Sequence, residues 1–165
     1  MSKQVLILFL AIAGIQRGNA QNTAIREGNK LYKEGRYDDA LAAYDKAAKN
    51  NPGDATAMYN RSNTLAKKGD KAAAMEAYDK IISNTADAGI KERSYYDKGV
   101  LHQQQQQLDE SIEAWKAALK LDPEDKAARE NLEKALREKK KQEQKKDEQK
   151  KDEQKKDKPD KKEQD

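Results

Sequence analysis

Few side chains in this sequence could carry out chemistry. The chain has one histidine and no cysteine. Its sequence contains neither a glycine-rich phosphate loop nor a cluster of metal-ligating residues. The residues needed for nucleophilic catalysis, phosphate chemistry or metal-assisted catalysis are therefore missing from the sequence. The acidic pairs Asp38–Asp39 and Asp109–Glu110 stand where helices are expected to begin, and acids there complement the helix dipole. His102 is expected to pack between two helices with a hydrogen-bond partner. The sequence therefore predicts a protein that is not an enzyme and that uses no cofactor or metal.

A pattern of small, aromatic and proline residues occurs three times along the chain. In each copy the two small residues are 12 positions apart, and an aromatic residue follows 4 positions later. Self-similarity with a period of about 34 residues is the signature of a helical solenoid, in which stacked hairpins bury one continuous core. The repeated positions are Gly28, Ala40, Tyr44 and Pro52, then Ser62, Ala74 and Tyr78, and then Gly99, Ser111, Trp115 and Pro123.

Each residue type in this pattern has a packing role. The small residue of the first helix lets its backbone approach the small residue of the second helix, and the aromatic ring lies one turn further along the same face. Pro52 and Pro123 are expected to end the second helices. The second copy begins 34 residues after the first, and the third begins 37 residues after the second. This difference places a three-residue insertion at positions 89–91.

The repeat resembles the tetratricopeptide repeat, whose pattern is W-x2-L-G-x2-Y, then A-x3-F, then P. Charged residues, Glu27, Arg61 and Lys98, stand in place of the leucine of that pattern. The resemblance implies an all-α solenoid of three hairpins with a C-terminal capping helix, and a role in binding other proteins. The segments that carry the resemblance are Glu27-Gly28, Ala40-x3-Tyr44 and Pro52, then Arg61-Ser62 and Ala74-x3-Tyr78, and then Lys98-Gly99, Ser111-x3-Trp115 and Pro123.

Composition and spacing divide the chain into a leader, a repeat body and a charged tail. Apolar side chains continue at helical spacing after the third repeat, which predicts a helix that covers the last hairpin. The expected organisation is a signal peptide at 1–20, repeat 1 at 21–54, repeat 2 at 55–88, the insertion at 89–91, repeat 3 at 92–125, the capping helix at 126–140 and the tail at 141–165.

The first 20 residues have the pattern of a secretory signal. Lys3 precedes an apolar run of 11 residues from Val5 to Ile15, and small residues stand at positions 18 and 20, so cleavage is expected after Ala20. The run is too short to span a bilayer core, which needs about 20 residues, and no transmembrane span is expected in the mature chain. An uncleaved membrane anchor is the alternative. The sequence predicts an exported protein, periplasmic after cleavage.

The repeat body is close to electrically neutral. The formal net charge of +4 comes from the two ends of the chain, and a basic face with interleaved aromatic residues is missing, so nucleic-acid binding is not expected. The tail repeats Glu-Gln-Lys-Lys-Asp from Glu143 to Asp157 and has no apolar seam for a coiled coil. We expect a solvated spacer that is helical near Leu136 and frays outward. A weak electrostatic tether to anionic envelope polymers or lipid head groups is the alternative.

The resemblance also implies where a partner binds. In tetratricopeptide domains the first helices of successive hairpins line a concave groove, and the matching positions here mix tyrosines, amides and cations. Tyrosine offers a large contact area with a polar tip, and amides can hydrogen-bond the backbone of an extended segment. Several of these residues are also ordinary members of the generic repeat. The predicted groove consists of Ile25, Asn29, Tyr32, Lys33, Tyr59, Asn63, Lys67, Arg93, Tyr96 and Gln103.

Some members of this family hold the terminal carboxylate of a chaperone peptide with a clamp of five polar residues. The resemblance places Ile25, Asn29, Asn60, Arg93 and Asp97 at those positions. Two of the cations are missing, and Asp97 would repel a carboxylate. The sequence therefore predicts a degenerate clamp.

The layout of leader, three repeats, capping helix and Lys/Glu/Gln-rich tail resembles the small periplasmic repeat proteins of the Bat aerotolerance operons. That resemblance implies partners among membrane-anchored von Willebrand A-type proteins, in an envelope complex for stress tolerance. Two hypotheses stay open: an adaptor whose groove binds a protein or peptide segment, and a structural tether whose tail makes the contact. Self-association of the chain is left open as well.

Overall fold

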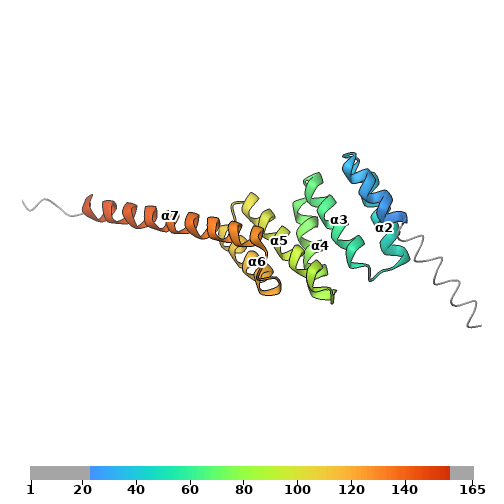
Figure 1. The fold of residues 1–165 in the computed structure, drawn as a ribbon. Coiled ribbons are helices and arrows are strands. Elements are labelled where there is room, and N and C mark those ends of the chain that lie inside the picture. The colour runs from blue at the N-terminus through green and yellow to red at the C-terminus, as the bar shows by residue number, and fades with distance from the viewer. Residues whose placement is uncertain (1–22, 157–165) are drawn as a thin grey trace, which may run out of the picture.

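The computed structural model describes residues 23–156, and this part of the chain is built from helices without strands (Figure 1). The all-α class predicted from the repeats is confirmed, whereas the predicted signal peptide, residues 1–20, lies outside the described residues. The first helix covers residues 23–33, and it is followed by α2 (Tyr37–Asn50), α3 (Ala55–Lys68), α4 (Lys71–Asn84), α5 (Ala88–Gln104), α6 (Leu108–Leu121) and α7 (Lys126–Lys156).

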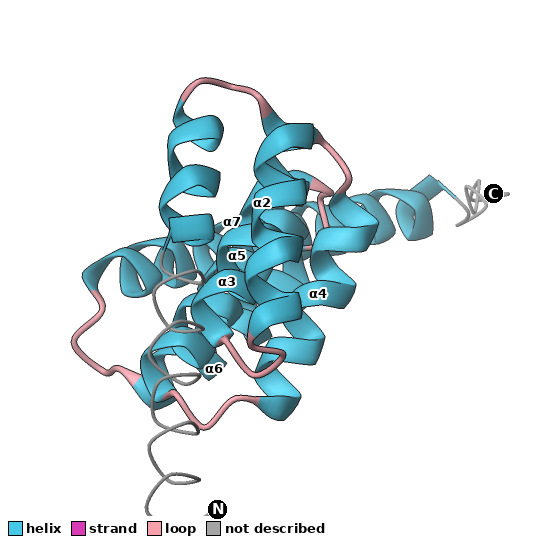
Figure 2. Ribbon diagram, turned by 90° about the vertical axis from the view of Figure 1, so that its right-hand side faces the viewer, coloured by secondary structure: helices cyan, strands magenta, loops and turns pink. Residues whose placement is uncertain are grey.

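The first six helices form three hairpins that stack on one another. Figure 1 shows the hairpins following one another along the molecule, and Figure 2 looks along the stack from the side of the first hairpin. Helices that are neighbours in the chain pack together, and α3 also contacts α5, the first helix of the next hairpin. This is the solenoid arrangement that the repeats predict. None of the described helices is both long enough and apolar enough to cross a membrane.

Aspartates, a glycine and two prolines set the ends of the helices. Asp54 and Asp87 are the N-caps of α3 and α5, and each side chain accepts a hydrogen bond from a backbone N–H of the first turn, which satisfies a donor that the helix leaves free. Gly69 is the C-cap that follows α3, and its φ of 98° is a left-handed conformation that suits glycine. Pro52 and Pro123 lie two residues beyond the ends of α2 and α6, as predicted.

The small residues of the repeat make room for aromatic rings. A Cβ added at Gly28 would lie 2.5 Å from the ring of Tyr44, and one at Gly99 would lie 2.4 Å from the ring of Trp115. These positions therefore require glycine, because a packed core leaves no space for the extra carbon. Sequence reasoning assigned the close approach to the facing small residue, but in the structure the ring one turn further occupies that space. Ser62, the matching residue of the second hairpin, is fully buried.

Two of the aromatic rings, Tyr78 and Trp115, join a hairpin to the next element, whereas the cluster around Tyr44 lies within the first hairpin. Tyr78 of α4 shares a core cluster with Ile90 and Leu101 of α5. Trp115 of α6 shares one with Ala128 of α7. At the first junction, Ala57 of α3 packs with Ala24 and Ala47 of the first hairpin. Each hairpin therefore shares apolar packing with the next element, and none buries its apolar face alone.

The three-residue insertion lengthens a helix. Residues 89–91 lie in the first turn of α5, which has 17 residues, whereas α2, α3, α4 and α6 have 14 each. The side chain of Ile90 is buried. The three extra residues between the second and third repeats thus lengthen the first helix of the third hairpin at its N-terminal end.

The predicted capping helix and the part of the predicted tail that the structure describes, residues 141–156, form one helix. α7 has 31 residues, and Ala128 and Ala135 in its first part are buried against α6, as expected of a cap. The helix shows no break at position 140 and continues to Lys156, away from the hairpins (Figure 1). Glycine and proline are absent from it, and opposite charges three or four residues apart each add a few tenths of a kcal/mol.

Two charged residues that replace the leucine of the repeat form ion pairs between hairpins. Arg61 Nε lies 2.6 Å from Asp45 Oδ1 of the preceding hairpin. Lys98 pairs in the same way with Asp79. An ion pair at a protein surface contributes about 0.2–1 kcal/mol to stability. The charged residues that replace leucine at positions 61 and 98 therefore link neighbouring hairpins weakly.

Candidate functional site

A groove runs along the first helices of the three hairpins. It consists of two adjoining cavities of about 330 and 220 Å³, which share Tyr32 and Asn63. Tyr44 and Tyr78 reach the groove from the second helices of their hairpins. The larger cavity is lined by Tyr32, Asn63, Ala66, Lys67, Tyr78, Asp97, Val100, Leu101 and Gln104, and the smaller by Asn29, Tyr32, Lys33, Tyr44, Asn60 and Asn63.

Tyrosine hydroxyls orient two amides in the groove. The Tyr44 hydroxyl donates a hydrogen bond of 2.6 Å to Asn29 Oδ1, and the Tyr78 hydroxyl donates to Asn63 Oδ1. Burial raises the pKa of Tyr44 to about 12, so this hydroxyl keeps its proton. Asn60 Nδ2 donates to the same Asn29 oxygen at 3.0 Å. With its oxygen engaged, Asn29 has its Nδ2 donors to offer to a bound segment, whereas the amide of Asn63 also interacts with the Tyr59 hydroxyl.

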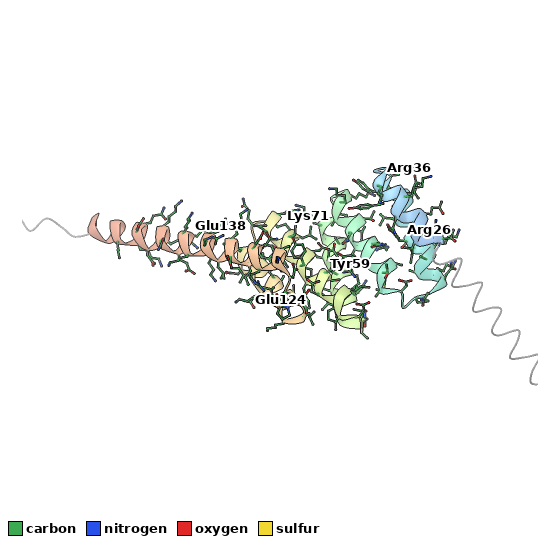
Figure 3. All side chains as sticks on the ribbon, in the orientation of Figure 1. Arg26, Arg36, Tyr59, Lys71, Glu124 and Glu138 are labelled. Carbon is green, nitrogen blue, oxygen red and sulfur yellow. The ribbon has the colours of Figure 1, made fainter. Side chains whose placement is uncertain are left out.

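One carboxylate lies in the larger cavity. Asp97 is half-buried, and its Oδ2 accepts a hydrogen bond of 2.6 Å from the Tyr59 hydroxyl. Burial raises the pKa of Asp97, while this hydrogen bond and the nearby Arg93 act in the opposite direction. The Arg93 guanidinium lies 5.2 Å from the centre of the Tyr59 ring, within cation–π range. Tyr59 is labelled near the middle of the stack in Figure 3, and this cluster links α3 to α5.

Five of the ten residues predicted to line the groove line one of its two cavities. Tyr59 and Arg93 lie beside Asp97 and connect two helices, and neither lines one of the two cavities. The predicted residues that do line a cavity are Asn29, Tyr32, Lys33, Asn63 and Lys67.

Three predicted groove residues lie elsewhere. Ile25 packs against the core of the first hairpin. Tyr96 is tied to α7, because its hydroxyl accepts a hydrogen bond of 3.2 Å from Asn131 Nδ2. Gln103 lines a separate cavity beside α7, together with Glu138. Tyr96 and Gln103 therefore lie beside α7 and line neither of the two groove cavities.

The acidic pairs lie at helix starts, as expected, and the histidine, which is half-buried, has a hydrogen-bond partner. The pairs at 38–39 and 109–110 lie in the first turns of α2 and α6. His102 Nδ1 lies 2.8 Å from Gln107 Oε1. All these residues contribute to helix ends and connections.

Sequence reasoning treated Tyr44 and Tyr78 as core residues only and missed their hydroxyls in the groove. A signal was present, because an asparagine stands 15 residues before each tyrosine, at positions 29 and 63. In the third hairpin Val100 has the matching place before Trp115, and there the Trp115 Nε1–H donates instead to the backbone oxygen of Tyr96 at 3.2 Å.

Comparison with known families identifies the repeats. Residues 25–89 and residues 92–125 match models of the tetratricopeptide repeat. The break between the two matches falls within the three-residue insertion. Among curated proteins, the Hsp70-Hsp90 organising protein of Plasmodium falciparum is 31% identical over 111 residues, which are 67% of this chain and 43% of that protein. The chain thus spans less than half the length of that relative.

Solved structures with the same fold include complexes with peptides. The TPR2AB-domain:pHSP90 complex of yeast Sti1 superimposes with a TM-score of 0.72 at 25% identity, over 76% of this chain and 50% of that one. The first TPR of Spaghetti (RPAP3), bound to the HSP90 peptide SRMEEVD, has a TM-score of 0.64 at 22% identity, over 72% and 92% of the chains. The second TPR domain of human RPAP3, in complex with the HSP70 peptide SGPTIEEVD, has a TM-score of 0.63 at 21% identity. The match covers 73% of this chain and 98% of that one.

Proposed function

Because the chain belongs to the tetratricopeptide-repeat family, we propose that it is a non-enzymatic adaptor whose groove binds a segment of a partner protein. The observation that carries the proposal is the set of groove side chains held in place by the protein itself, Asn29 by Tyr44 and Asn63 by Tyr78. Side chains that are already ordered lose little conformational entropy on binding. Related folds in complex with peptides support the same role.

The proposed place of action is the bacterial cell envelope. The signal pattern of residues 1–20 supports export and cleavage after Ala20. The layout of the chain resembles the periplasmic repeat proteins of the Bat aerotolerance operons. In that setting the partner is a membrane-anchored protein with a von Willebrand A-type domain.

Filling the larger cavity tests the adaptor function. Ala66→Trp and Gln104→Trp each place an indole among the lining residues, and we expect both to abolish capture of the partner. Ala42→Trp, at an exposed site on α2, is the matched control and should capture normally. Capture is measured by crosslinking in envelope fractions followed by mass spectrometry. Undiminished capture by both cavity variants, with normal thermal unfolding, would exclude the groove.

A second candidate function is that of a tether. The observation that favours it is the length of α7, which runs beyond the hairpins to Lys156 with charges of both signs. Contacts of this kind weaken as salt screens the charges. Deleting residues 142–165 separates the two functions: the adaptor keeps its partner, whereas the tether loses its envelope contact and loses it in high salt as well.

A further inference from the structure

We propose that the groove selects a partner segment with a cationic side chain, lysine or arginine, which pairs with Asp97. This inference rests on the proposed adaptor function and specifies the chemistry of its ligand. The geometry leaves an acceptor open in the larger cavity. Asp97 Oδ2 accepts the hydrogen bond from Tyr59, while Oδ1 has no hydrogen-bond partner in the described part of the chain.

The cations near Asp97 are engaged elsewhere or are exposed. Arg93 lies against the Tyr59 ring, and its Nε donates to the backbone oxygen of Gly89 at 3.2 Å. Lys67 lines the same cavity but is exposed. Among the described residues no lysine or arginine forms a salt bridge with Asp97. A half-buried carboxylate without an ionic partner gains most from a cation that a ligand brings.

Burial decides which charges of the groove dominate selection. An ion pair at a given distance is roughly four times stronger at the effective dielectric near a protein surface than in bulk water. Lys33 and Lys67 are exposed, so their attraction for acids is weakened by water and salt. Asp97 is half-buried, and burial raises its pKa against the opposing effects of the Tyr59 hydrogen bond and of Arg93, so a cation brought by a ligand would further stabilise its charged form.

The same carboxylate discriminates against acidic ligands. The peptides in the related solved complexes, SRMEEVD and SGPTIEEVD, end in acidic residues and a terminal carboxylate. A like charge at Asp97 would repel such a terminus. The groove thus shares the fold of those proteins and has a charge suited to a different class of segment.

Peptide selection tests this inference directly. The purified chain and its variants Asp97→Asn and Asp147→Asn are immobilised separately. Each is offered three pools of peptides with acetylated N-termini and amidated C-termini. The peptides have random sequences except at the central position, which is arginine in one pool, its neutral isostere citrulline in the second and glutamate in the third. Asp147 lies on the outer part of α7, so its variant carries the same change of charge outside the groove. We expect the unchanged chain and Asp147→Asn to retain arginine peptides about tenfold more than citrulline peptides. Asp97→Asn should show no such preference.

The other outcomes overturn the inference in distinguishable ways. Equal retention of arginine and citrulline peptides, or preference for glutamate, would leave the groove as an adaptor site and remove the cation selectivity. A preference for arginine that survives in Asp97→Asn would place the cation elsewhere. If no pool is retained, the adaptor function fails as well.

A second measurement guards against a variant that fails to fold. N-acetylarginine amide is titrated into the isotope-labelled, unchanged chain, with N-acetylcitrulline amide as the neutral control. We expect NMR shifts at the Asn63 side chain and the Val100 amide, which line the same cavity as Asp97, with the cationic compound alone. Shifts of equal size with both compounds would contradict the pairing.

Discussion

Single side chains hold the groove in shape through partners that are distant in the sequence. Asn29 receives hydrogen bonds from Tyr44 and Asn60, which lie on two other helices. Each bond contributes about 0.5–1.5 kcal/mol to stability, and each also turns an amide so that its NH2 group is available. Stability and binding therefore depend on the same residues.

Glycine at positions 28 and 99 is required by the aromatic ring that packs against it. Gly28→Ala and Gly99→Ala place a carbon within 2.5 Å of ring atoms, and overpacking of this kind costs about 1–3 kcal/mol. Gly53→Ala is the control, because its Cβ meets nothing closer than 3.9 Å. Urea unfolding should show a large loss of stability for the first two variants and little for the third. An unchanged midpoint for Gly28→Ala would contradict the packing described here.

Glu92 makes the stability of the protein dependent on pH. Its side chain is buried, and Oε1 has no hydrogen-bond partner in the described part of the chain. Burial, the hydrogen bond with Asp125 and the charges of Asp125 and Asp122 raise the pKa of Glu92 to about 7, and Arg93 opposes this. Between its ordinary pKa of 4.5 and 7 the folded state therefore keeps a proton that the unfolded chain has lost. Stability falls as pH rises through this window, by up to about 3 kcal/mol.

Replacing Glu92 tests this linkage. Glu92→Gln has no proton to lose, so we expect it to unfold at a higher temperature than the unchanged chain at pH 7.5 and to differ less from it at pH 5. The exposed Glu130→Gln on α7 is the control. If the unfolding temperatures of Glu92→Gln and of the unchanged chain varied with pH in the same way, Glu92 would not be the group that makes stability depend on pH.

At the scale of helices, the first part of α7, which contains its buried alanines, is the part that covers the third hairpin. Ala128 and Ala135 are buried in the cluster with Trp115, and the Lys139 Nζ lies 2.7 Å from Asp109 Oδ1 of α6. The outer part, beyond Gln142, has a sequence of charged and amide residues.

Truncation at two points separates these parts. Removing residues 143–165 should change the urea midpoint only slightly, because exposed positions contribute about 0.5 kcal/mol or less each. Removing residues 126–165 uncovers the ring of Trp115, and we expect a loss of about 3 kcal/mol or more. A large loss from the shorter deletion would mean that the outer helix contacts the hairpins.

The spacing of small and aromatic residues was enough to predict the helices and their hairpin pairing. The same spacing could not show that residues 89–91 extend a helix, because an insertion is equally compatible with a loop. Nor could it predict that α7 runs unbroken to Lys156, since charge pairs act weakly and additively. Tyr96 fits the generic groove pattern, yet its hydroxyl is engaged by Asn131 on α7. That contact depends on how the cap sits on the last hairpin.

For the whole molecule, stability is expected to vary along the stack. The clusters of the first hairpin consist of Leu31, Tyr44 and small alanines, whereas the third hairpin contains Trp115 and is covered by α7. In a solenoid each hairpin depends on its immediate neighbours. We expect amide hydrogens of helix 23–33 and α2 to exchange faster than those of α5 and α6. Equal protection throughout would indicate a single cooperative unit.

The same type of ion pair occurs at both junctions between hairpins. Each junction sets an aspartate, Asp45 or Asp79, against a cation on the following helix, Arg61 or Lys98. The hairpin formed by α3 and α4 therefore carries the cation at one end and the aspartate at the other. A duplicate of this hairpin, spliced in behind the original, would meet a complementary charge on both sides. As far as these charges are concerned, the stack could be lengthened by one hairpin with every aspartate and cation of the junctions still paired.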